Sequence, residues 1–225
     1  MSFADKKLSE IAISIPGSTV LLREYDLDFC CGGADTLGAA VAEKNLNLAE
    51  IEARLTELQE SKQQDDEQRW LTAPYAEIID HIIHRYHERH RAQLQELIVL
   101  AERVESVHGD RDDCPVGVAA ELHNVYADLS SHMMKEEQIL FPMIKMGNYA
   151  MARMPIQVME HEHAEHGEHL EVLKALTNNL TPPADACNTW RALYSGIKEF
   201  MDDLMMHIHT ENNILFPRVI EEGSR

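Results

Sequence analysis

The stretch HMMKEEQILFPMI at His132–Ile144 decides how this sequence folds, and a related stretch, HIHTENNILFPRV, recurs at His207–Val219. In each copy a histidine is followed four residues later by a glutamate, and then by an identical Ile-Leu-Phe-Pro run. Residues i and i+4 lie on the same face of an α-helix. Each copy therefore presents an imidazole beside a carboxylate, and two facing copies would direct both pairs into one cavity. The duplicated motif predicts a metal site between helices, with ligands for two ions.

The composition is typical of an all-helical globular protein. Hydrophobic residues make up 44% of the 225 residues and charged residues 26%, and no alternating β-branched pattern with turn dipeptides predicts a sheet. The formal charge of −19 argues against a nucleic-acid partner, because phosphates would be repelled. No apolar run approaches a membrane span, and the N-terminus lacks the apolar core of a signal peptide. We therefore expect a cytoplasmic protein without a membrane partner, whose cysteines remain thiols.

The chain divides into two helical regions. Residues 1–60 are predicted to form a small N-terminal domain, with short helices on either side of Pro16-Gly17 and a helix capped by Asn47. Residues 61–73 include a polar run and are predicted to be a linker. The remaining residues, 74–225, contain four longer helical patterns, at about 74–108, 118–146, 155–178 and 186–220. Short connections between long helices predict an antiparallel four-helix bundle.

Histidines upstream of the two motifs complete the candidate site. His87 precedes His132 by almost the same interval as His163 precedes His207, so each of two related hairpins would supply a similar set of ligands. The resulting candidate ligands are His87, His132, Glu136, His163, His207 and Glu211. Imidazole and carboxylate ligands without thiolate suit iron or manganese and are tolerated by zinc. Two-metal carboxylate sites of this kind occur inside four-helix bundles.

Periodicity leaves an alternative open at the upstream histidines. The pair His90 and His166 fits the repeat as well as the pair His87 and His163 does. Histidines outside the candidate set are assigned to solvent or to hydrogen bonds around the centre: His84, His90, His161, His166, His169 and His209. Glu162, adjacent to His163, is either a hydrogen-bonding partner of the centre or a solvated carboxylate.

Cys30 and Cys31 lie in the sequence DLDFCCGG at Asp26–Gly33. Adjacent cysteines bond to each other only with strain, so a structural disulfide is not expected. The glycine-rich turn makes the thiols accessible, which predicts redox reactivity, contact with a metal, a cluster or a partner, or a disulfide that links two copies of the chain. The alternative is a pair of half-buried thiols at a tight turn. Cys114 and Cys187 have no obvious partners, and we assign them no function.

The sequence resembles the repair-of-iron-centres family over essentially its whole length. The six candidate ligands look like those of a hemerythrin-like di-iron domain, and DLDFCCGG resembles the short N-terminal domain of these repair proteins. The resemblance implies that in RYHERH, at Arg85–His90, the first histidine, His87, is the ligand. It also implies that the cofactor is a pair of non-haem iron ions with an oxo or hydroxo bridge.

The resemblance further implies a function in restoring iron–sulfur clusters damaged by nitric oxide or oxidants. The recipients would be the damaged iron–sulfur proteins, and the mode of action would be iron donation rather than conventional enzymatic turnover. A ligand set with fewer histidines than oxygen-carrying hemerythrins have argues against oxygen storage and fits a loosely held metal. Two alternatives remain, namely an enzyme that reduces nitric oxide at the iron pair, and a sensor of oxygen or nitric oxide.

Overall fold

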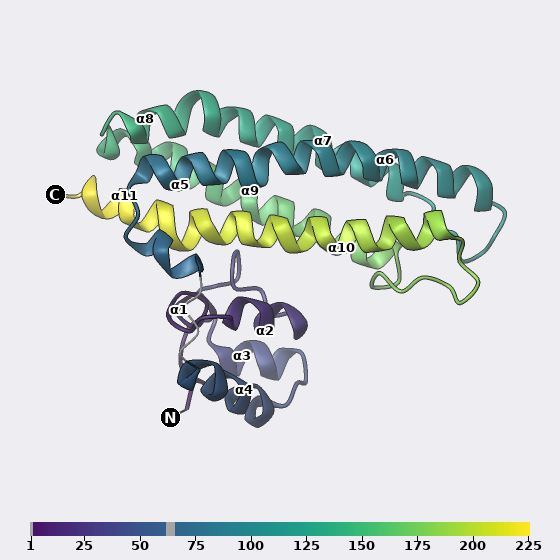
Figure 1. The fold of residues 1–225 in the computed structure, drawn as a ribbon, viewed down its shortest axis with the longest axis horizontal. Helices are drawn as coiled ribbons and strands as arrows, with labels where there is room; N and C mark the ends of the chain where they lie inside the picture. Colours follow the sequence, from purple (N-terminus) through teal and green to yellow (C-terminus); the bar gives the residue numbers. More distant parts are fainter. Residues whose placement is uncertain (1, 62–65) are drawn as a thin grey trace.

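The computed structural model describes residues 2–61 and 66–225 and shows two helical parts, with the smaller one beneath a bundle of long helices (Figure 1). The all-α prediction is confirmed. Within these ranges, pairing between extended segments is limited to an isolated bridge between Lys7 and Thr36. None of the helices in the described ranges combines the length and the apolar character that a membrane span requires.

The N-terminal part contains four short helices: α1 (Leu8–Ser14), α2 (Ser18–Glu24), α3 (Leu37–Glu43) and α4 (Leu48–Glu60). Gly17, with φ +78°, separates the first two where the Pro16-Gly17 break was predicted. The Asn47 side chain caps α4 by accepting a hydrogen bond from the Glu50 amide at 3.4 Å. The buried side chains that hold these helices together include Leu8, Ile11, Leu22, Leu37, Ile51 and Leu55.

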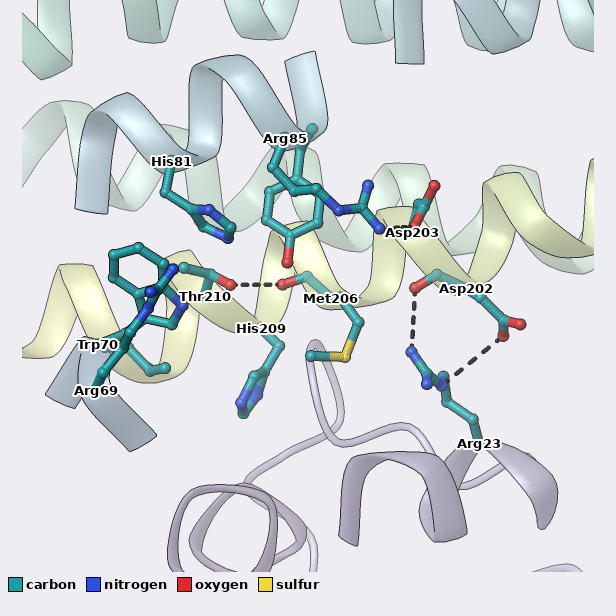
Figure 2. A pocket seen from close by; sticks show the side chains of 12 residues that line it. Arg23, Arg69, Trp70, His81, Arg85, Asp202, Asp203, Met206, His209 and Thr210 are labelled. Atoms are coloured by element: carbon teal, nitrogen blue, oxygen red, sulfur yellow. Dashed lines mark hydrogen bonds and ion pairs between the residues drawn. The ribbon is translucent and has the colours of Figure 1, made fainter. Parts of the chain in front are cut away.

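Four of the predicted linker residues, 62–65, lie outside the described residues. The linker residues that follow include a 3₁₀-helix, η1 (Asp66–Leu71). Trp70, in η1, is buried and stacks on His81 with 4.3 Å between ring centroids (Figure 2). This aromatic contact explains why a polar-looking segment ends in an ordered turn against the bundle.

The bundle consists of long helices, three of which are interrupted by a π-helical segment. The first comprises α5 (Tyr75–His81), η2 (Ile82–His87) and α6 (Glu88–His108). The second comprises α7 (Val118–Lys135), η3 (Glu136–Leu140) and α8 (Phe141–Lys145). The third is α9 (Tyr149–Leu176), and the fourth comprises α10 (Asn188–His209), η4 (Thr210–Leu215) and α11 (Phe216–Glu222).

The predicted antiparallel bundle is confirmed. Going around it, α6 packs against α7, α7 against α9, α9 against α11, and α10 against α6. The two loops that join α6 to α7 and α9 to α10 lie at the same end of the bundle (Figure 1). The predicted start of the third helix, near Pro155, is wrong, because α9 begins at Tyr149 and contains Pro155. Pro155 has no amide hydrogen to donate to the Met151 carbonyl four residues earlier. Met151 is 68% exposed, so water can donate to this carbonyl instead.

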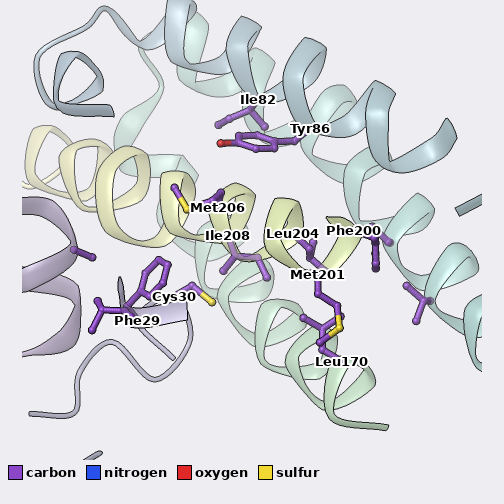
Figure 3. Close-up of a cluster of buried hydrophobic side chains, with 14 of the residues drawn as sticks. Phe29, Cys30, Ile82, Tyr86, Leu170, Phe200, Met201, Leu204, Met206 and Ile208 are labelled. Carbon is purple, nitrogen blue, oxygen red and sulfur yellow. The ribbon is translucent and has the colours of Figure 1, made fainter. Parts of the chain in front are cut away.

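The N-terminal part docks on the bundle through the loop between α2 and α3. Figure 3 shows Phe29 and Cys30 from this loop beside Met206 and Ile208 of α10. Phe29 is fully buried, and its ring meets the edge of His209 at a centroid distance of 5.2 Å. The Asn213 side-chain amide donates to the Phe29 carbonyl at 2.9 Å. These contacts place the Cys30–Cys31 turn against α10 and η4 of the bundle.

Candidate metal centre

The π-helical segments lie where the candidate ligands are. His87 is the last residue of η2, Glu136 is the first residue of η3, and Glu211 is the second residue of η4. π-Helical turns make up well under 1% of residues in proteins and are frequent at functional sites. Three of the six candidate residues lie in such segments, which indicates that this part of the bundle is a functional site.

The repeated Ile-Leu-Phe-Pro run accounts for two of these turns. A proline has no amide hydrogen, and its ring clashes with the carbonyl four residues earlier in an α-helix. For Pro142 that carbonyl belongs to Gln138, inside η3, and for Pro217 it belongs to Asn213, inside η4. Widening the helix to a π turn relieves both clashes. The proline of each motif therefore shapes the turn that carries the glutamate.

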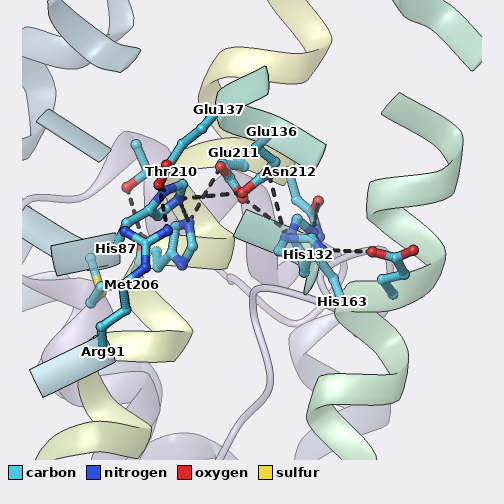
Figure 4. A network of polar contacts seen from close by, with 12 residues as sticks. His87, Arg91, His132, Glu136, Glu137, His163, Met206, Thr210, Glu211 and Asn212 are labelled. Atoms are coloured by element: carbon cyan, nitrogen blue, oxygen red, sulfur yellow. Dashed lines mark hydrogen bonds and ion pairs between the residues drawn. The ribbon is translucent and has the colours of Figure 1, made fainter. Parts of the chain in front are cut away.

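The structure brings all six candidate residues together as two clusters that share both glutamates (Figure 4). His87 and His207 face each other with 3.2 Å between their Nε2 atoms, and His132 and His163 with 3.1 Å. Two nitrogens bound at ~2.1 Å to one ion, at angles between a right angle and the tetrahedral angle, lie roughly 3.0–3.4 Å apart. Each histidine pair is thus spaced as two ligands of a common ion are.

Each glutamate reaches both clusters. Glu136 places Oε2 at 3.3 Å from His87 Nε2 and Oε1 at 3.4 Å from His132 Nε2. Glu211 places Oε1 at 3.3 Å from His207 Nε2 and Oε2 at 3.1 Å from His163 Nε2. One carboxylate oxygen from each glutamate is therefore available to each histidine pair. This is the arrangement of two bridging carboxylates.

The four shared oxygens have no hydrogen-bond partner among the described residues, although both glutamates are fully buried. Buried carboxylate oxygens without donors are costly unless a cation or a proton satisfies them. A pair of metal ions between the histidine pairs would satisfy all four at once. The residues present therefore fit a two-metal centre.

Charge at the centre is distributed unevenly. Burial alone would lower the pKa of His87 and of His132, but the nearby glutamates raise these pKa values to about 9 and about 10. Burial, together with the charge of Glu136, raises the pKa of Glu211 to about 7. Protons on these groups replace the positive charge that metal ions would supply. Metal binding must therefore release protons.

Three of the four histidines are oriented by an acceptor at Nδ1. His87 donates to Glu137 at 2.8 Å, His132 to Glu162 at 2.9 Å, and His163 to Asn212 at 2.8 Å. Such partners fix the tautomer, so that Nε2 offers its lone pair to the metal. Glu137 in turn accepts a hydrogen bond from Arg91 at 2.7 Å, and Glu162 one from Lys135.

Of these partners, the sequence singled out only Glu162. The two missed residues, Glu137 and Asn212, each directly follow a ligand glutamate in the repeated motif. The position after each ligand glutamate was the sequence signal that could have identified them.

A cavity of about 120 Å³, whose lining includes Glu162 and His166, opens beside the His132 side of the centre.

The remaining histidines divide as follows. His90 and His166, the alternative ligands, are buried and lie beside His207 and His132, with ring centroids 5.3 Å and 4.9 Å apart. They do not belong to either candidate cluster. Of the two assignments made for these histidines, solvent exposure is excluded for His90, His166 and His209, the last of which is 2% exposed and packs against Phe29. Burial beside the ligands agrees with the other assignment, a position around the centre, for His90 and His166. His84 and His161 are exposed.

Comparisons with known proteins agree with this geometry. Residues 78–219 match the family model described as the hemerythrin HHE cation binding domain, and residues 4–59 match ScdA_N, a domain of unknown function. A probable iron-sulfur cluster repair protein of Haemophilus influenzae is 69% identical over 99% of this chain and all of its own length.

Two further relatives are iron-sulfur cluster repair proteins named YtfE. The protein of Musicola paradisiaca is 56% identical over 98% of both chains. The protein of Escherichia coli is also 56% identical, over 98% of this chain and 99% of its own. This chain belongs to the repair-of-iron-centres family. The family assignment covers both helical parts, so the N-terminal part is a regular component of these repair proteins.

The structure places Cys30 and Cys31 near the centre, with all four cysteines as free thiols. Cys31 Sγ donates to the backbone carbonyl of His163 at 3.3 Å, and the Cys30 carbonyl accepts from Asn212 Nδ2 at 3.0 Å. Cys30 is buried and Cys31 half-buried. Contact with Cys31 and burial hold the pKa of the Cys30 thiol well above its usual range. The expectation of two freely accessible thiols therefore needs correction for Cys30.

Proposed function

We propose that this chain holds two iron ions between His87, His132, Glu136, His163, His207 and Glu211 and donates iron to damaged iron–sulfur proteins. The observation that carries the proposal is the pair of shared, fully buried glutamates whose four oxygens lack hydrogen-bond donors in the described structure. The names of the relatives supply the class of recipient. A cytoplasmic location agrees with the free thiols.

The donor set supports iron as the metal. Each half-site would have two imidazole nitrogens and an oxygen from each shared carboxylate, and no thiolate. Such mixed nitrogen and oxygen sites suit non-haem iron, and they leave coordination positions for an oxo or hydroxo bridge or a small molecule. Carboxylates that span both ions bind each of them through only one oxygen. If one ion left such a centre, its two histidines would be released, but both glutamates could still bind the other ion.

A route for iron supports the donor function. The lining of one cavity includes Glu162 and His166, and the Glu162 carboxylate accepts hydrogen bonds from His132, a candidate ligand, and from Lys135. Hydrogen bonding from His132 lowers the pKa of Glu162 to about 2, so its carboxylate stays charged at neutral pH. Lys135 compensates part of this charge, but the carboxylates of Asp128 and Glu165 line the same opening, so its overall charge favours a cation.

A second function has a specific observation in its favour. The shared carboxylates place the two half-sites side by side, and ions with open positions there would suit the reductive coupling of two nitric oxide molecules. The third possibility, a sensor, would use the contact between the Cys30 carbonyl and Asn212 to signal to the N-terminal part. Both alternatives require iron that stays in the protein, whereas donation requires iron that leaves.

The test measures iron content in anaerobically purified full-length protein and then iron transfer to a ferrous chelator after reduction. The proposal expects two irons per chain that leave on reduction, and the variants Glu136→Ala and Glu211→Ala should each retain at most one. Two irons that stay bound would contradict donation, and catalytic nitrous oxide formation would then favour the enzyme. Zinc in place of iron would overturn both di-iron functions.

A further inference from the structure

The turn that contains Cys30 and Cys31 is folded around the carboxylate of Asp28. Asp28 Oδ1 accepts the backbone amides of Cys30 and Cys31 at 3.0 Å and 2.9 Å, and Oδ2 accepts that of Gly32 at 2.9 Å. A Cβ at Gly33 would lie 2.5 Å from the Phe29 carbonyl oxygen, so only glycine allows the chain to close here. The turn is thus fixed by the residues on both sides of the cysteines.

This fold brings two thiols and a carboxylate to one point. Side chains of adjacent residues point to opposite faces of an extended chain. Here, by contrast, the two Sγ atoms lie 3.8 Å apart, and Cys30 Sγ lies 3.2 Å from Asp28 Oδ1. The three ligand atoms all lie within 4.8 Å of one another. Two thiolates bound at about 2.3 Å to one tetrahedral ion lie about 3.8 Å apart.

We propose that Asp28, Cys30 and Cys31 form a third cation site, separate from the two-metal centre, which takes a sulfur-binding cation such as ferrous iron or zinc. The site is built from the N-terminal part alone, whereas the six ligands of the centre all come from the bundle. Two sulfur ligands exclude magnesium and calcium, which prefer oxygen. On binding, the two thiol protons leave to solvent and two thiolate bonds to the cation form, without change of oxidation state.

The surroundings of the turn suit a cation of this class. A cavity of about 300 Å³ lies between the turn and helices α9 and α10, and its lining includes Asp28, Cys30, Cys31, Met201 and Met205. Lys44 and Lys174 also line this cavity, but both are paired with Asp26, at 2.7 Å and 2.6 Å, and the thioether sulfurs of Met201 and Met205 are soft ligands without charge. A ligand from another molecule would have room in this cavity to complete the coordination of a bound cation.

The third site is connected to the two-metal centre through Asn212. Its side-chain amide donates to the Cys30 carbonyl at 3.0 Å, while its Oδ1 accepts from His163 Nδ1 at 2.8 Å. Cys31 Sγ also contacts the His163 carbonyl at 3.3 Å. A cation at the turn would thus be held two hydrogen bonds away from a ligand of the centre. The site is separate from the opening beside Glu162 through which iron is proposed to leave, so it does not depend on that route.

The experiment uses full-length, metal-free, reduced protein titrated with cobalt(II) under argon. Cobalt bound to thiolate gives a sulfur-to-metal charge-transfer absorption, which the imidazole and carboxylate ligands of the centre cannot produce. We expect this absorption to saturate with three cobalt ions bound per chain. The double variant Cys30→Ser/Cys31→Ser should lose the absorption and bind two ions, while the matched control Cys114→Ser/Cys187→Ser should keep both the absorption and the third ion.

A second variant tests the carboxylate without removing sulfur. Asp28→Asn retains an acceptor for the turn but loses the charge, and it should weaken cobalt binding at the thiolates, since loss of even an outer-shell partner costs about 10–100-fold in affinity. No charge-transfer absorption in the unmodified protein, or an absorption that survives in Cys30→Ser/Cys31→Ser, would overturn the proposal. Iron donation is tested separately by transfer of iron to a chelator. The third cation site can therefore be disproved without disproving iron donation, and the reverse also holds.

Discussion

At the scale of single residues, the candidate centre depends on groups that touch no metal. Glu137 orients His87 and accepts a hydrogen bond from Arg91. Asn212 orients His163. These partners decide which imidazole nitrogen carries the proton, and therefore whether Nε2 can bind. Residues next to the ligands in sequence should consequently control the affinity for metal, while the ligands themselves control how many ions bind.

Glu137→Gln tests this division. The amide can still meet His87, but it cannot stabilise positive charge there, so we expect metal affinity to fall about 10–100-fold while two ions still bind. Competition with a chelator measures the affinity, and metal analysis of the saturated protein measures the stoichiometry. Glu88→Gln is the matched control, because Glu88 contacts His84 at 2.9 Å on the exposed surface. If both variants bind metal equally weakly, the total charge of the protein, and not the orientation of His87, determines the metal affinity.

At the scale of helices, the π turns show what the sequence could and could not reveal. The spacing of His132 and Glu136, and its repetition at His207 and Glu211, predicted that these four residues face one another, because residues four apart share a face. Periodicity left the choice of upstream histidines open, and only the resemblance to the repair family indicated His87. The two prolines also stand in the sequence, but a proline is compatible with a kink, a helix end or a π turn. Pro155 illustrates the ambiguity, since it indicated a helix start and instead lies inside α9. Tertiary packing decides among these outcomes.

Pro142→Ala should have opposite effects on the stability of the helix and on the affinity of the site for metal. Alanine restores an amide that can bond to the Gln138 carbonyl, which favours a regular α-helix in place of η3. We expect unfolding of the metal-free protein in denaturant to become harder by at most about 3 kcal/mol, the usual cost of a proline inside a helix. The same variant should bind metal more weakly, because Glu136 begins η3 and would be reoriented.

Pro155→Ala provides the comparison for this prediction, because Pro155 lies inside α9 away from any π turn. It should gain stability in the same denaturation experiment and bind metal with unchanged affinity. If Pro142→Ala also leaves metal affinity unchanged, the π turn is a consequence of the proline without a role in positioning Glu136.

At the scale of the whole molecule, the N-terminal part is joined to the centre by contacts that no local pattern predicts. The sequence indicated two regions and a cysteine-containing turn, but which surface the turn meets depends on how the two parts pack. Asn212 and Asn213 occupy adjacent positions and both donate to the turn, at the carbonyls of Cys30 and Phe29. Asn212 alone also contacts a candidate ligand, His163. Docking and metal binding therefore share one side chain.

Substitutions at these two positions can show whether docking controls iron retention. Asn212→Ala removes both contacts, and we expect the reduced protein to lose iron to a chelator about 10–100-fold faster. Asn213→Ala removes the Phe29 contact and the hydrogen bond to His209 Nδ1, and iron loss should stay close to that of the unmodified protein. Asn212→Asp keeps an acceptor for His163 but has no donor for Cys30.

The aspartate variant decides between orientation and docking. Iron retained by Asn212→Asp would show that Asn212 acts by orienting His163, since the bond to the turn is absent in this variant. Rapid iron loss from Asn212→Asp and from Asn213→Ala alike would show instead that contact with the N-terminal part holds the iron. In that case, a recipient protein that binds the turn and displaces it from Asn212 would itself trigger release.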